Sequence, residues 1–176
     1  MKKTSFVTVP MLIAVSVAIL CVSCAGSRPH PDAPPGRQVI GEVEPVTLVK
    51  AGVTLPARID TGATTSSLDA TNIKNFERDG KKWVRFTLTD RKSKEARELE
   101  RKLSRTVKIT SHGKKSQGRP VIKMKIMLGG VELYKEFTLT DRSEFTYQIL
   151  IGRNVLEGEF IVDVTLKNVT TPMDEE

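Results

Sequence analysis

Cysteine and histidine are scarce in this chain of 176 residues, and their positions exclude two kinds of chemistry. Both cysteines, Cys21 and Cys24, lie near the N-terminus, so the rest of the chain has neither a disulfide nor a thiol nucleophile. The two histidines, His30 and His112, stand far apart, and no His-Glu-x-x-His segment is present. Because a catalytic zinc ion usually needs three ligands at suitable spacing, we expect no metal site.

A phosphate-binding loop and abundant aromatic residues are also missing. No Gly-x-x-x-x-Gly-Lys-Ser/Thr segment is present, so we expect neither ATP nor another cofactor. Aromatic residues make up 5% of the chain, which argues against a platform for stacking nucleic-acid bases. The formal net charge of +7 therefore indicates a solvated basic surface, suited to anionic lipid headgroups or envelope polymers, with no nucleic-acid partner.

The N-terminus has the pattern of an export signal. The apolar run Val9–Val22 follows two lysines and is short for a membrane-spanning helix. It ends at Cys21-Val22-Ser23-Cys24, which resembles the lipobox of bacterial lipoproteins, although leucine usually stands where this chain has Cys21. The resemblance implies that a lipid on Cys24 anchors an exported protein in the cell envelope, facing the periplasm. Simple secretion and a retained N-terminal anchor are the alternatives.

This interpretation divides the chain into four parts. Residues 1–24 form the signal peptide, and residues 25–37 form a Pro-rich tether. Residues 38–168 form one domain, and residues 169–176 form an acidic tail. A domain of this length suits a single modest core.

The domain has the pattern of an all-β protein. From Val53 to Ile59 apolar and polar residues alternate, which predicts a strand with residues 53, 55, 57 and 59 on one face. The pairs Asp79-Gly80 and Gly129-Gly130 predict tight turns. Further strands are expected at Val46–Val49, Asn72–Arg78, Trp83–Leu88, Ile122–Ile126, Val131–Leu133, Phe137–Thr140 and Phe160–Val164, with a short helix at Arg153–Glu157.

One stretch, Asp90–Arg119, is rich in charged residues and resists assignment. In its first half, Ala96, Leu99 and Leu103 have helical spacing, but a strand pattern follows, so we assign this half to neither a helix nor a strand. Its second half reverts to a strand pattern at Thr106–Thr110.

The segment Asp60-Thr61-Gly62-Ala63 directly follows the strand predicted at Val53–Ile59. Asp and Gly are common in ordinary turns, so these residues alone are weak evidence for catalysis. The segment Ile149–Leu156, with the sequence ILIGRNVL, strengthens the catalytic interpretation. Two carboxylates a few ångströms apart share one proton, because both cannot ionise, and such a pair can activate a water molecule.

Together these two segments resemble the signature elements of retropepsin-like aspartic peptidases. The resemblance implies a closed β barrel with one short C-terminal helix, in which Gly152 packs beneath the active-site turn. It implies that Asp60 is catalytic and that Thr61, Gly62, Ala63 and Gly152 support it. Since this chain has one Asp-Thr-Gly, the second carboxylate would be Asp60 of an identical subunit, in a homodimer.

The resemblance also implies roles for the backbone and for a flap. We expect Thr61 to bond across to its counterpart in the partner subunit. We expect Gly62 to adopt a backbone conformation closed to other residues and to bring its amide to the carboxylate. A hairpin flap would cover an extended peptide, and the turns at Asp90–Lys94 and Ser111–Gly118 are the candidates for its tip.

More of the domain, about residues 38–165, is similar to a bacterial family of small retropepsin-like proteins often labelled ATP-dependent zinc proteases. The similarity rests on Arg58–Leu68, Gly118–Val121, Phe137–Ser143 and Leu150–Arg153. The lack of zinc ligands and of a phosphate-binding loop argues against both parts of that label.

Three other charged residues have competing interpretations. We expect Asp141 to cap a turn or form an ion pair. We expect Asp163, in an otherwise apolar strand, to pair with Arg58 or Arg153, or to be the second carboxylate of a monomeric site. Arg153 is expected to stabilise the helix or the dimer.

The function that we predict is hydrolysis of a peptide or envelope protein by a homodimeric aspartic endopeptidase. The main alternative is a non-catalytic lipoprotein of the same fold that binds a peptide or a partner. A third is a structural envelope lipoprotein that acts through a basic face containing Lys114 and Lys115.

Overall fold

The computed structural model describes residues 36–109 and 117–170. Most of the expected tether and tail, and the whole signal peptide with Cys24, lie outside the described residues. In chain order the elements are β1 (Gln38–Ile40), β2 (Val43–Leu48), β3 (Val53–Ile59), β4 (Ser66–Asp69), β5 (Thr71–Arg78), β6 (Lys81–Thr89), β7 (Ala96–Ile109), β8 (Gln117–Leu128), β9 (Val131–Thr140), β10 (Ile149–Ile151), α1 (Arg153–Leu156) and β11 (Phe160–Val162).

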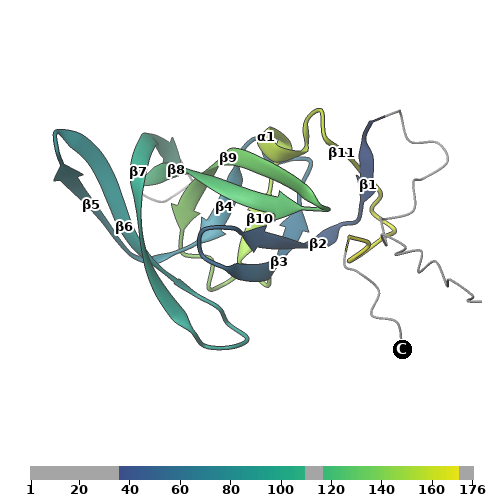
Figure 1. Ribbon diagram of the computed structural model, residues 1–176, viewed down its shortest axis with the longest axis horizontal. Helices are drawn as coiled ribbons and strands as arrows, with labels where there is room; N and C mark the ends of the chain where they lie inside the picture. Colours follow the sequence, from purple (N-terminus) through teal and green to yellow (C-terminus); the bar gives the residue numbers. More distant parts are fainter. Residues whose placement is uncertain (1–35, 110–116, 171–176) are drawn as a thin grey trace, which may run out of the picture.

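Six of these strands close into a barrel. Their order around it is β2-β3-β10-β4-β9-β8, and β8 pairs back with β2 to complete the ring (Figure 1). The helix α1 follows β10 after Gly152; it begins at Arg153, as predicted, and ends one residue before the predicted end. The predicted all-β fold, a closed barrel with one short C-terminal helix, is therefore confirmed.

The barrel core follows from the alternation of the strands. In β3 the side chains of Leu55, Ala57 and Ile59 are buried, whereas the residues between them are exposed, as the alternating pattern predicts. The largest fully buried side chains come from the six barrel strands, from β6 and from the end of β1: Phe86, Phe137, Ile40, Leu48, Leu55, Leu68, Leu88, Ile122, Ile126, Leu128, Leu139 and Ile149.

Beyond β8 the sheet continues outward through β7 and β6 to β5, and we call these three strands the arm (Figure 1). The predicted turn at Asp79-Gly80 joins β5 to β6, and both residues have positive φ, 51° and 66°. This conformation suits a two-residue hairpin loop because its twist matches that of the flanking strands.

The first half of Asp90–Arg119, which the sequence left unassigned, contains a turn followed by the start of a strand. The segment from Ala96 onward belongs to β7, which pairs with β6 along one edge and with β8 along the other. The helical spacing of its apolar residues is therefore misleading, because pairing with the strands before and after it in the chain satisfies its backbone groups.

The two ends of the domain lie together. Strand β1 pairs in parallel with β11, at the end of the molecule opposite the arm (Figure 1). After β11 the chain is held by Glu44, a fully buried residue whose carboxylate accepts hydrogen bonds from the Thr170 amide at 3.0 Å and the Thr170 hydroxyl at 2.7 Å. The single helix of the described part has four residues, so no helix in those ranges could cross a membrane.

Candidate active site

Asp60 lies immediately after β3, where the chain turns towards β4. Its amide donates to the carbonyl oxygen of Ile151 at 2.9 Å, which ties the turn to the end of β10. Its Oδ1 atom accepts hydrogen bonds from the amides of Gly62 at 2.9 Å and Ala63 at 3.2 Å. Within the described residues, Oδ2 accepts no hydrogen bond. One oxygen of the carboxylate is thus fixed, and the other is available to a water molecule or a second carboxyl group.

Gly62 brings its amide to the carboxylate as expected, but its backbone differs from our expectation. Its φ is not positive, so the prediction of a conformation closed to other residues is wrong. The constraint is space, because a Cβ atom on Gly62 would lie 3.1 Å from Oδ1 of Asp60. Thr61 is exposed, and its bond to a counterpart in a partner subunit stays a prediction.

The segment ILIGRNVL packs against this turn. Strand β10 lies between β3 and β4, parallel to β3 and antiparallel to β4. The amide of the buried Gly152 donates to Oγ of Ser66 at 3.0 Å. A Cβ atom on Gly152 would lie 2.8 Å from the carbonyl oxygen of Ala63 and 2.9 Å from the carbonyl carbon of Thr65. No side chain fits at Gly152 unless the turn moves.

Arg153 binds the turn that carries Asp60. Its Nη1 donates to the carbonyl oxygens of Thr61 at 3.0 Å and Gly62 at 2.8 Å, and its Nη2 donates to Oγ1 of Thr64 at 2.9 Å. The expectation that Arg153 stabilises the helix or the dimer therefore omitted its main contact. The guanidinium group spans three acceptors and so holds the turn in one shape.

Asn154 holds the exit of the turn, a role that the sequence did not indicate. Its Oδ1 accepts from the amide of Ser66 at 2.9 Å and from the hydroxyl of Ser66 at 2.8 Å. Its Nδ2 donates to the carbonyl oxygen of Glu136 at 2.9 Å. Asn154 thereby connects α1 to β4 and β9, and its place beside Gly152 and Arg153 in ILIGRNVL was the only available signal.

A buried arginine lies within electrostatic reach of Asp60. Arg142 is 6% exposed, and it donates from Nη1 to Oγ of Ser67 at 2.8 Å and from Nε to the carbonyl oxygen of Tyr147 at 3.1 Å. Burial lowers the pKa of Arg142, while the negative charges of Asp69 and, more weakly, of Asp60 act in the opposite direction.

Two further arginines accompany Arg142. Arg91 donates from Nη2 to Oδ2 of Asp69 at 2.7 Å, and the charges of Arg91 and Arg119 both act to lower the pKa of Arg142. The Nε atom of Arg119 is buried and has no hydrogen-bond partner in the described part of the chain. We call Arg91, Arg119 and Arg142 the arginine cluster; no sequence pattern indicated a role for any of them.

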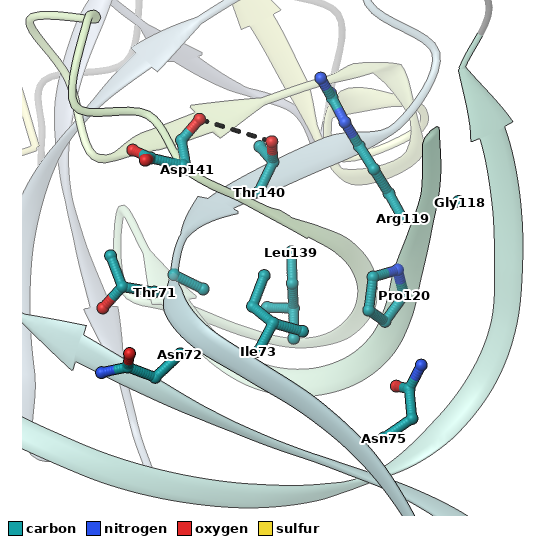
Figure 2. Close-up of a pocket in the computed structure, with 11 residues that line it drawn as sticks. Thr71, Asn72, Ile73, Asn75, Gly118, Arg119, Pro120, Leu139, Thr140 and Asp141 are labelled. Atoms are coloured by element: carbon teal, nitrogen blue, oxygen red, sulfur yellow. Dashed lines mark hydrogen bonds between the residues drawn. The ribbon is translucent and has the colours of Figure 1, made fainter. Parts of the chain in front are cut away.

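A cavity of about 540 Å³ is lined by one member of the arginine cluster, Arg119 (Figure 2). Arg119 and Asp141 lie on its polar side, while Ile73, Pro120 and Leu139 line its apolar part. Asp60 does not line it. The cavity is thus adjacent to the cluster and separate from the candidate catalytic carboxylate.

The other candidate residues have structural contacts. Asp141 caps a turn as predicted, because its Oδ1 accepts from the amide of Ser143 at 2.8 Å. Asp163 follows β11, which ends at Val162, so its expected place inside a strand is wrong. Oδ1 of Asp163 accepts from the amide and hydroxyl of Thr165. Arg58, one expected partner of Asp163, pairs with Glu42 at 2.6 Å.

The two candidate flap turns differ in what the structure describes. The turn at Asp90–Lys94 closes through a hydrogen bond from the Lys94 amide to the Asp90 carbonyl oxygen at 2.8 Å. The tip at Ser111–Gly118 lies mostly outside the described residues. The position of the flap stays a prediction.

Known proteins resemble this chain in sequence and in fold. A probable alpha-L-glutamate ligase of Shewanella pealeana is 37% identical over 128 residues, which cover 71% of this chain and 28% of that protein. A probable alpha-L-glutamate ligase of Desulfotalea psychrophila is 31% identical over 136 residues, which cover 74% of this chain and 29% of that protein. The chain therefore spans less than a third of the length of these curated relatives.

One solved structure is similar to this chain over nearly the whole length of the solved protein. A protein of unknown function from Legionella pneumophila has 33% sequence identity and a TM-score of 0.67, over 76% of this chain and 98% of that one. A sequence model of the RimB-like family, described as "Retropepsin-like aspartic endopeptidase RimB", matches residues 39–173. These residues include the Asp60 turn, Gly152 and the arginine cluster, so the chain belongs to the RimB-like family of retropepsin-like proteins.

Proposed function

We propose that this protein is an aspartic endopeptidase whose catalytic centre contains Asp60 from each of two copies. The observation that carries the proposal is the asymmetric environment of the Asp60 carboxylate. Two amides hold Oδ1, while Oδ2 accepts no hydrogen bond within the described residues. A carboxylate held in this way is oriented towards an external group, as a shared-proton pair requires.

The reaction follows from the two protonation states of such a pair. The ionised Asp60 takes a proton from a bound water molecule as the water oxygen attacks the peptide carbonyl carbon. The protonated Asp60 of the other copy donates its proton to the carbonyl oxygen. When the tetrahedral intermediate collapses, the carbon–nitrogen bond breaks and the nitrogen takes the proton of the protonated Asp60. A hydroxyl group of the intermediate gives its proton to the ionised Asp60 as it becomes the carbonyl of the new carboxyl group. The pair again holds one proton, and no covalent intermediate forms.

A homodimer is needed because the chain has one Asp-Thr-Gly segment. A two-fold axis that passes beside the turn would bring the two Asp60 carboxylates together and supply Thr61 twice. The two-stranded sheet of β1 and β11 supports this arrangement, since its outer edges have no strand partner within the described residues. Such edges are suited to pairing with another copy.

The substrate class that the site supports is a peptide with acidic side chains. The arginine cluster places three positive charges close together; Arg91 is paired with Asp69, whereas the buried Nε of Arg119 has no partner in the described part of the chain. An incoming carboxylate would form charge-assisted hydrogen bonds with such groups. The name of the curated relatives, alpha-L-glutamate ligase, makes glutamate the first residue to test.

The location that we propose is the cell envelope. The pattern of residues 1–24 supports export, and Cys24 is suitably placed for a lipid that anchors the domain facing the periplasm. The domain would then act near a membrane on peptides or envelope proteins. Nucleic acid and metal ions have no part in the proposal.

The test is cleavage by the isolated domain, residues 28–176. A solved relative consists almost entirely of this domain, which supports its folding alone. The domain and an Asp60→Asn variant would be incubated with a mixture of acidic and neutral peptides at about pH 3 to 8, and mass spectrometry would identify the products. We expect cleavage that requires Asp60 and a dimer by analytical ultracentrifugation.

Three results would contradict the proposal. Cleavage that persists in Asp60→Asn would assign the activity to another group. A folded domain without cleavage that binds peptides would support a non-catalytic binding module. A folded domain with neither property, whose envelope function is lost on charge reversal of Lys114 and Lys115, would support a structural lipoprotein.

A further inference from the structure

The arm has one buried face and one exposed face. Along β6 the side chains of Val84, Phe86 and Leu88 are buried in the core. Because side chains alternate along a strand, Trp83 and Arg85 lie on the opposite face. We call this opposite surface of β5, β6 and β7 the outer face; Arg85 is exposed on it.

Aromatic rings and guanidinium groups form a stack on the outer face. The rings of Phe76 and Trp83 lie 6.4 Å apart at an interplanar angle of 27°. The Arg78 guanidinium lies 5.2 Å from the Phe76 ring and 5.0 Å from the Trp83 ring. The Arg85 guanidinium lies 5.6 Å from the Phe76 ring on the same face. These contacts hold the chain's single tryptophan in a cationic surrounding.

The outer face has an excess of positive charge. Strand pairing places Lys81 opposite Arg78, Lys74 opposite Arg85, and Lys102 opposite Trp83, so all three lysines share the outer face. The carboxylates on this face are Glu98 and Glu100, both within ion-pair distance of Arg85. Five cations thus accompany two carboxylates, and Lys74 and Lys102 form no ion pair in the described parts of the chain.

Protection of a sheet edge explains only part of this pattern. β5 is the edge strand of the sheet, and charged residues on an edge oppose unwanted pairing between copies. That reason applies to Lys74 and Arg78. It does not apply to Trp83 in β6 or Lys102 in β7, since both strands are paired on each side.

We propose that the outer face of the arm binds the surface of an anionic lipid bilayer. Excess lysine and arginine attract anionic headgroups, and a partly exposed tryptophan suits the boundary between headgroups and acyl chains. Nucleic acid fits less well, because guanidinium groups already cover the ring faces on which bases would stack. The lipid expected on Cys24 would bring the domain to such a surface, and the outer face would fix its orientation.

The test measures binding of the domain, residues 28–176, to vesicles. One set contains phosphatidylcholine alone, and the other contains phosphatidylcholine with phosphatidylglycerol. We expect binding to the anionic vesicles that weakens as salt is added, with a shift of Trp83 fluorescence to shorter wavelength. Charge reversal of Lys74 and Lys102 to glutamate should weaken this binding at least about tenfold. The control reverses Lys50 and Lys123, which are exposed on other strands and turns, and should leave it nearly unchanged.

Several outcomes would overturn the proposal. These are equal binding to neutral vesicles, equal loss in the control variant, or no change of Trp83 fluorescence on binding. Binding to nucleic acid or to an acidic polypeptide, without binding to anionic vesicles, would also overturn it. None of these results depends on peptidase activity, so the proposed function is tested separately.

Discussion

The Arg153 guanidinium donates to the carbonyl oxygen of Gly62 at 2.8 Å, so α1 directly holds the turn that contains Asp60. The same group also reaches Thr61 and Thr64. Within the turn, the Gly62 and Ala63 amides donate to Oδ1 of Asp60, and the Ala63 amide also reaches the Asp60 carbonyl oxygen, at 3.3 Å. The shape of the turn therefore depends on a residue 93 positions later in the sequence.

Replacing Arg153 with lysine should lower peptidase activity by roughly 100-fold, because small displacements of a catalytic group have large effects on rate. An ammonium group cannot span the three acceptors that the guanidinium reaches. Since Arg153 is exposed, the free energy of unfolding should change little. Steady-state kinetics and urea denaturation would be measured together. Unchanged kcat in Arg153→Lys would show that the turn holds its shape without this contact.

Gly152→Ala should destabilise the domain by about 1–3 kcal/mol, because the new methyl group overlaps backbone atoms of Ala63 and Thr65. Activity per folded molecule should also fall, since the turn must move to make room. Gly158→Ala is the matched control: its φ of +85° is strained for alanine, but no atom lies within 4 Å of the added Cβ. Urea denaturation would measure stability and steady-state kinetics would measure activity. Only Gly152→Ala should lose both. Equal activity in the two variants would contradict this account.

Arg119→Gln should lower kcat/KM for peptides with glutamate by roughly 10- to 100-fold relative to matched peptides with glutamine. The buried Nε of the Arg119 side chain has no hydrogen-bond partner within the described residues. Its removal should therefore leave stability unchanged or slightly increased. Arg105→Gln, which removes an ion pair to Glu136, is the control and should leave the glutamate preference intact. A preference that survives in Arg119→Gln would remove the arginine cluster from substrate recognition.

The sequence predicted those parts of the fold that depend on local patterns. The alternation of Val53–Ile59 and the turn at Asp79-Gly80 are encoded by neighbouring residues, and both are confirmed. Strand β7 could not be assigned, because its pairing with β6 and β8 decides its conformation. The helical spacing of Ala96, Leu99 and Leu103 gives no sign of that pairing.

In the candidate site, too, local patterns reveal some residues, whereas strand pairing decides the position of others. Asp60 and Gly152 lie in recognisable segments, so their neighbourhood could be anticipated. The arginine cluster could not, because it depends on the register of β4 against β9. That register places Ser67 opposite Thr138 and Asp69 opposite Thr140, which brings Arg142 onto Ser67 and Asp69. No local pattern around Arg142 indicates that its side chain is buried.

Glu44→Gln should destabilise the domain by at least about 2 kcal/mol. The two carboxylate oxygens of Glu44 accept four hydrogen bonds, from the amides of Gly41, Val169 and Thr170 and from the hydroxyl of Thr170. Glutamine would present an NH₂ group to donors that need an acceptor, in a fully buried position. Urea denaturation would measure the loss, with the exposed Glu77→Gln as control. A loss no larger than that of the control would show that the C-terminal segment is held by other contacts.

The domain should be less stable at pH 3 than at pH 7, although a shared-proton pair favours activity in acid. Hydrogen bonds from Lys167 and Arg58 lower the pKa of Glu42 below its usual 4.5, and hydrogen bonds from Arg85 and Arg78 do the same for Glu100. The Ser104 hydroxyl and then Arg105 lower the pKa of Glu136.

A carboxylate whose pKa is lower in the folded state stabilises the fold above its unfolded pKa. That contribution is lost as the pH falls from about 4.5 through the folded pKa. The urea midpoint should therefore fall across this range, and Glu136→Gln should differ from the unmodified domain at pH 7 but much less at pH 3. Added salt should reduce the difference at pH 7, because these ion pairs are partly exposed. A midpoint that rises on acidification would contradict this prediction, because other titrating groups would then outweigh these carboxylates.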